Sequence, residues 1–125
     1  MDKEQEMRKF DSGATRNIDN NKLDFEGFFS PIVLHRYAEY LQKHRKQKDG
    51  NIRDSDNWQK GIPKDAYMKS ELRHTMDLWL VHRGFNAVNP DDGTDCDIEE
   101  LLCAITFNSM GYLFELLKEK CKKRD

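Results

Sequence analysis

Three polar residues at helical spacing could together hold a metal ion. His74 and Asp77 lie one turn apart in one predicted helix, and Glu100 lies in the next. Carboxylate oxygens and imidazole nitrogens are common ligands of divalent cations, and packed helices about 8–10 Å apart bring such side chains within reach of one ion. We therefore expect His74, Asp77 and Glu100 to face one another and to bind a catalytic metal. Glu99 is a further candidate ligand, but it lies on the other side of the helical wheel, so Glu100 is the better candidate.

A buried hydrogen-bond network is the alternative interpretation of the same residues. A single histidine on an apolar helix face is usually a core residue whose polar atoms have partners. Glu100 follows Asp97 by three residues, which is the spacing of a capping box at a helix start. Both interpretations stay open on the sequence alone.

Asn108 is the polar residue in the last helix that most needs a partner. It shares one stripe of the helical wheel with Glu100, Ala104, Gly111 and Glu115, between two apolar arcs. An asparagine in such a place is costly when unpaired, and the small residues leave room for another group to approach. We expect Asn108 to contact a substrate.

The connection before the second helix carries residues suited to a nucleotide. Trp58 has a flat face on which a purine could stack, but it could equally be a lid on the core. Lys60 supplies a positive charge, and Asn57 adds an amide. We predict these residues as substrate contacts, together with Arg73 and Arg16 for phosphate. Arg16 lies in a polar stretch that could wrap a phosphate or could be a flexible terminus.

Capping signals predict helices near 30–46, 63–83 and 97–121. Ser30-Pro31 is typical of a helix start, Gly84 of a helix end, and Asp97 of an N-cap. The basic residues 43–46 suit the end of the first helix, which explains them without a phosphate ligand. We expect an all-α fold, a bundle of three main helices without a sheet, preceded by a polar N-terminal arm.

Composition limits the classes of protein to which the chain can belong. Its 125 residues suffice for one domain over 1–125, and the net charge of −2 does not favour a nucleic-acid partner. The three cysteines cannot all pair within the chain and match no zinc motif. The polar start and the absence of a long apolar run predict no signal peptide and no membrane partner, and therefore a cytoplasmic protein.

Four stretches of the chain carry a family resemblance: 8–16 (RKFDSGATR), 57–61 (NWQKG), 73–77 (RHTMD) and 99–104 (EELLCA), the last followed by Phe107-Asn108. They resemble the small, largely phage-encoded proteins described as dATP/dGTP diphosphohydrolases, which are related to the MazG-like all-α nucleoside triphosphate pyrophosphohydrolases. The parent enzymes carry two glutamates three apart on one helix, then a glutamate and an aspartate three apart on the next. The matching positions here hold His74 and Asp77, then Glu100 and Cys103.

The resemblance implies an enzyme of nucleotide metabolism. It would be a dimeric or larger helical bundle, such as a tetramer, that holds Mg²⁺ or Mn²⁺ between helices. Its reaction would hydrolyse a purine deoxynucleoside triphosphate, dGTP or dATP, to the monophosphate and pyrophosphate, which adjusts the phage deoxynucleotide pool. The replacement of two carboxylates favours a second hypothesis, a non-catalytic helical module that binds a nucleotide or a host protein.

Overall fold

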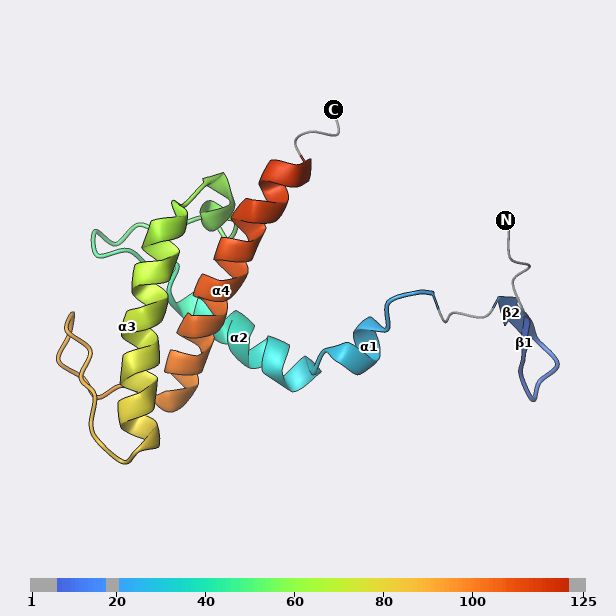
Figure 1. Cartoon of the computed structure of the whole chain (residues 1–125), viewed down its shortest axis with the longest axis horizontal. Helices are drawn as coiled ribbons and strands as arrows, with labels where there is room; N and C mark the ends of the chain where they lie inside the picture. The colour runs from blue at the N-terminus through green and yellow to red at the C-terminus, as the bar shows by residue number, and fades with distance from the viewer. Residues whose placement is uncertain (1–6, 18–20, 122–125) are drawn as a thin grey trace. The chain divides into compact units, whose positions relative to one another are not determined.

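The computed structural model describes residues 7–17 and 21–121, and it divides the chain into two compact units, Met1–Leu34 and His35–Asp125. The sequence predicted one domain. Most described residues outside the connections are helical, as predicted (Figure 1). The C-terminal unit contains the two long helices and all the buried residues of the described chain.

The N-terminal unit contains a small sheet, so the prediction of a fold without a sheet is wrong. Strands β1 (Met7–Lys9) and β2 (Thr15–Asn17) pair antiparallel, with Arg8 opposite Arg16. Gly13 in the turn adopts a φ of 89°, which glycine tolerates because it lacks a Cβ. The strands are too short and too polar to show the alternation that identifies a strand in a sequence. Helix α1 (Phe25–Phe28) follows, and its first turn is capped by Asp24.

The main helices begin and end close to the predicted positions. Helix α2 (Pro31–Lys43) starts at the proline, and α3 (Lys64–His82) ends just before Gly84, whose φ is 85°. Helix α4 (Ile98–Cys121) follows Asp97, and the Asp97 carboxylate accepts a hydrogen bond from the Glu100 backbone N–H at 3.3 Å. A short 3₁₀ helix, η1 (Asn57–Lys60), lies in the connection between α2 and α3.

Helix α2 ends three residues earlier than predicted because the chain turns back there. Lys46 forms an isolated antiparallel bridge with Ile52, and Gly50 adopts a φ of 88° at the turn between them. The Arg53 backbone N–H then donates to the Arg45 carbonyl at 2.8 Å. This turn returns residues 51–53 to the end of α2.

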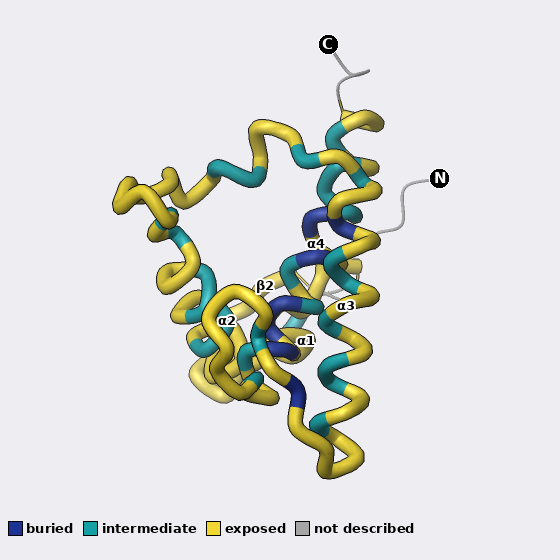
Figure 2. The backbone as a smooth tube through the Cα atoms, turned by 90° about the vertical axis from the view of Figure 1, so that its left-hand side faces the viewer, coloured by how far each residue is buried: buried dark blue, intermediate teal, exposed yellow. Residues whose placement is uncertain are grey.

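The core of the C-terminal unit lies between α3 and α4, which run antiparallel side by side (Figures 1 and 2). Tyr67 of α3 is 1 % exposed, and it packs against Gly111 of α4. A Cβ added to Gly111 would lie 2.3 Å from the Tyr67 ring, so only glycine fits under it. The small residue that the sequence placed in a polar stripe therefore makes room for a tyrosine.

Helix α4 also presents a mostly apolar surface to solvent, and Ser109 at its edge donates a hydrogen bond to Glu71 of α3. Its exposed residues between positions 102 and 117 are all uncharged: Leu102, Thr106, Ser109, Met110, Leu113, Leu116 and Leu117. Helices that are apolar on every side are normally buried on every side. We call these seven residues the outer face of α4.

By length and composition alone, α4 could cross a membrane. The core helix of a soluble protein passes the same test, and α4 supplies buried residues to the contact with α3. The absence of a membrane partner and the cytoplasmic location stay predictions.

Candidate functional site

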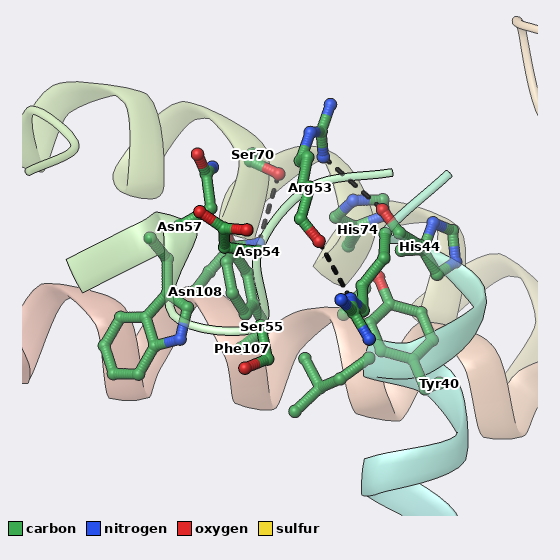
Figure 3. Close-up of a pocket in the computed structure, with 14 residues that line it drawn as sticks. Tyr40, His44, Arg53, Asp54, Ser55, Asn57, Ser70, His74, Phe107 and Asn108 are labelled. Atoms are coloured by element: carbon green, nitrogen blue, oxygen red, sulfur yellow. Dashed lines mark hydrogen bonds between the residues drawn. The ribbon is translucent and has the colours of Figure 1, made fainter. Parts of the chain in front are cut away.

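A cavity of about 260 Å³ opens in the C-terminal unit where four segments meet (Figure 3). Its walls come from the end of α2, the connection 53–58, and the facing sides of α3 and α4. Of the predicted site residues, Asn57, Trp58, His74 and Asn108 line it. Residues from both long helices and from the connection that contains Trp58 thus meet at one place.

One end of the cavity is cationic. Figure 3 shows Arg53, His44 and His74 there, and Arg45 joins them through its hydrogen bond to Arg53. The Arg45 Nε donates to the Arg53 carbonyl at 2.8 Å, while the Arg53 guanidinium donates to the His44 carbonyl at 3.4 Å. Within residues 7–17 and 21–121, neither arginine pairs with a carboxylate. Arginine side chains without a carboxylate partner are suited to binding an anion.

The other end of the cavity is aromatic and uncharged apart from one carboxylate. Trp58 meets Phe114 edge-on, with ring centroids 4.7 Å apart, and Phe107 at 6.5 Å. Figure 3 shows Phe107, Asn57 and Asp54 together at this end. The two functions left open for Trp58 are compatible, because a tryptophan packed on the core also lines the cavity. This end suits a flat heteroaromatic ring.

The floor of the cavity contains buried polar groups. Asn108 is 4 % exposed, and its Nδ2 donates to Ser70 Oγ at 3.1 Å. The prediction that Asn108 is buried and needs a partner is confirmed, and Ser70 is one partner. The Nδ1 atom of His74 is buried and has no hydrogen-bond partner among the described residues. A buried imidazole nitrogen without a partner is costly.

Both histidines of the cavity are disposed to be neutral. Burial lowers the pKa of His74, and the nearby Arg73 lowers it further, while Asp77 opposes the shift. Burial also lowers the pKa of His44, against the effect of Glu100. At neutral pH each imidazole therefore carries an unprotonated nitrogen that can accept a proton.

Glu100 lies outside the cavity, in a cluster of ion pairs. One of its carboxylate oxygens accepts from Lys43 Nζ at 2.6 Å and the other accepts from Arg36 at 3.1 Å. His44 Nε2 lies 3.8 Å from the first oxygen. Burial opposes ionisation of Glu100, but these hydrogen bonds outweigh it and hold its pKa below the ordinary value. Glu99 accepts from Arg36 at 2.7 Å.

The predicted metal ligands do not gather. Among the described residues there is no group of three His, Cys, Asp or Glu side chains that could hold a metal ion. The oxygens of Glu99 and Glu100 are satisfied by Arg36 and Lys43 instead. In this arrangement the set His74, Asp77 and Glu100 does not fit a shared ion. A Mg²⁺ or Mn²⁺ site stays a prediction.

Three further predicted residues of the C-terminal unit, Lys60, Arg73 and Asp77, do not line the cavity. Lys60 pairs with Asp54 at 3.7 Å on the surface, and Arg73 is exposed on α3. Asp77 is half-buried on α3 and influences His74 electrostatically. Arg16 belongs to strand β2 of the N-terminal unit.

The charged and titratable residues of the cavity that the sequence did not indicate are His44, Arg45, Arg53 and Asp54. The basic run 43–46 is the part of the sequence that could have indicated an anion site, although helix capping also explains it. Arg45 lies beyond the end of α2, and its guanidinium donates to Arg53 and Gln42. The run 43–46 contains four basic residues, which is more than helix capping needs. The turn that follows it brings Arg53 back to Arg45.

Comparison with known proteins adds no relative: no family model, curated protein or solved structure matches the chain.

Proposed function

We propose that the C-terminal unit binds a purine deoxynucleoside triphosphate in the cavity and hydrolyses it to the monophosphate and pyrophosphate. The observation that carries the proposal is the division of one cavity into a cationic end and an aromatic end. A nucleotide has the same division, since its phosphates are anionic and its base is a flat heteroaromatic ring. The resemblance of several stretches to dATP/dGTP diphosphohydrolases supports the same substrate.

The cationic end is suited to the phosphates. The guanidinium groups of Arg45 and Arg53 are held by backbone carbonyls and keep N–H groups free for phosphate oxygens. The volume of about 260 Å³ is slightly below the roughly 300–1,000 Å³ typical of small-molecule sites. A triphosphate would therefore extend past the exposed side chain of Arg53 into solvent.

His74 is the residue best placed to act in hydrolysis. It lines the cavity, and its lowered pKa keeps the imidazole neutral. In the proposed step, a water oxygen bonds to the α-phosphorus while a proton of that water moves to His74. The bond from the α-phosphorus to the bridging oxygen breaks, and pyrophosphate leaves with the bonding electrons. Arg45 and Arg53 stabilise the negative charge of the leaving group.

A non-catalytic nucleotide-binding module is the second candidate, and the ion pairs of Glu100 favour it. Glu100 and Glu99 are held by Arg36 and Lys43, so no acidic cluster faces the cavity. Such a module would bind the same nucleotide and release no pyrophosphate.

Pyrophosphate release distinguishes the two candidates. Purified full-length protein should release pyrophosphate from dGTP or dATP in the presence of Mg²⁺ or Mn²⁺. The eight common ribo- and deoxynucleoside triphosphates should be tested, each with an EDTA control that also tests the predicted need for metal. Binding without pyrophosphate release under any of these conditions would support the non-catalytic module, and absence of binding would reject both candidates.

We propose that a second copy of the chain covers the outer face of α4. The face has no exposed charge between positions 102 and 117, so two copies related by a two-fold axis would present complementary apolar surfaces to each other. Leu113 lies near the middle of this face and is 53 % exposed.

Charge on the outer face is expected to dissociate the oligomer. Light scattering with size-exclusion chromatography should give a dimer or tetramer for the wild type and a monomer for Leu113→Glu, because a carboxylate is costly to bury at an apolar interface. Lys120→Glu changes an exposed residue near the end of the same helix and should not alter the mass. A monomeric wild type at tens of micromolar would contradict the proposal.

A further inference from the structure

The aromatic end of the cavity contains a single carboxylate, that of Asp54. Asp54 lines the cavity beside Asn57 and in front of Phe107 (Figure 3). Its backbone carbonyl accepts the Asn57 N–H at 3.0 Å, and this turn fixes Asp54 next to the start of η1 and therefore close to Trp58. A base stacked at Trp58 would present one edge to this carboxylate.

The Asp54 carboxylate can change its partner at little cost. Its ion pair with Lys60 is long, at 3.7 Å, and the side chains of Asp54 and Lys60 are 75 % and 66 % exposed. Exposed ion pairs of this kind contribute little stability. An ionised carboxylate is an acceptor with two oxygens, so it binds best a group that offers two neighbouring N–H donors.

Among the four DNA bases, guanine alone presents two neighbouring N–H donors on one edge, at N1 and at the 2-amino group. Adenine presents one amino donor beside an acceptor nitrogen, and the lone pair of that nitrogen would face the carboxylate unfavourably. Cytosine has the same donor–acceptor order, and thymine has a single N–H between two carbonyls. We infer that Asp54 is a specificity-determining residue that selects guanine over adenine in this cavity.

The inference rests on the proposed function, since it takes the aromatic end as the base-binding end. The other polar groups there do not make the same distinction. The amides of Asn57 and Asn108 can each present a donor or an acceptor, so they can pair with either purine. Discrimination between guanine and adenine therefore depends on the Asp54 carboxylate, which can only accept hydrogen bonds.

Binding constants of full-length protein for three nucleotides test this role. The probes are the α,β-methylene analogues of dGTP, dATP and dITP, which resist cleavage between the α- and β-phosphates, measured by titration calorimetry. The wild type should bind the guanine analogue about 10- to 100-fold more tightly than the adenine analogue, the range expected for one good bidentate contact. The hypoxanthine analogue, which lacks the 2-amino group, should lie between them.

Asp54→Asn should bring the affinity ratio of guanine to adenine close to one, by weakening the guanine analogue and leaving the adenine analogue unchanged. Asp56→Asn is the matched control, because Asp56 is an exposed aspartate of the same loop that does not line the cavity. Equal binding of both purines by the wild type, or an unchanged ratio in Asp54→Asn, would overturn the inference while leaving the proposed function intact. If none of the three analogues binds, the proposed function fails as well.

Discussion

Replacing His74 by asparagine is expected to lower pyrophosphate release about 10²- to 10⁴-fold, the usual contribution of a general base. His74 lines the cavity and its lowered pKa keeps the imidazole neutral, so it can accept a proton from the attacking water in the proposed complex. An amide cannot accept a proton at neutral pH. His82→Asn is the matched control, because His82 lies exposed in the last turn of the same helix and outside the cavity.

The pH dependence of turnover gives an independent check on His74. Its pKa lies below the ordinary 6.5 because burial and Arg73 disfavour the charged form. The neutral base therefore predominates above pH 6.5, and turnover should fall to half only at lower pH, as the imidazole takes up a proton. An acid limb above pH 6.5, or a His74→Asn protein with wild-type turnover, would show that another group is the base.

Gly111→Ala is expected to destabilise the C-terminal unit by about 1–3 kcal/mol or more, the usual cost of overpacking. The added Cβ would lie 2.3 Å from the Tyr67 ring, which is 1 % exposed and has nowhere to move without displacing α3. The better helix propensity of alanine offsets at most about 1 kcal/mol of this cost. Urea unfolding followed by circular dichroism measures the difference.

A double-mutant cycle shows whether the Tyr67 ring is the cause. In a Tyr67→Ala background, which removes the ring, Gly111→Ala should be neutral or slightly stabilising because only the propensity gain remains. The coupling between the two positions should then be roughly as large as the penalty of the single glycine substitution. If Gly111→Ala destabilises both backgrounds equally, the contact with Tyr67 is not what demands glycine there.

Local signals predicted the helices well because caps are local. Pro31, Gly84 and Asp97 each act through the backbone within one turn, so their effect can be read from neighbouring residues. Strands β1 and β2 were not predicted because they lack such local signals: a strand of three mostly polar residues has no cap and is too short to show an alternating pattern.

The site was harder to predict because a helical wheel shows which residues share a face and not what lies opposite. Glu100 stands at the polar break in α4 where the wheel placed it, but the groups that meet it are Lys43 and Arg36, 57 and 64 residues earlier in the chain. Asn108 was recognised as a buried polar residue from its own helix, yet its partner Ser70 comes from another. The contact between Arg45 and Arg53 depends on a turn in the connection, and helical periodicity gives no information about that turn.

The cavity is assembled from segments that are separate in the chain, and this links ligand concentration to the lifetime of the protein. The end of α2, the connection 53–58 and the two long helices meet only in the folded unit, so the unfolded chain has no binding site. In the proposed complex, the nucleotide would stabilise the fold by about 2.7 kcal/mol at a hundred times its dissociation constant. Proteases that attack the unfolded chain would spare the protein while nucleotide is plentiful and remove it once the pool is drained. Its cellular abundance would thus follow its own substrate without any separate regulator.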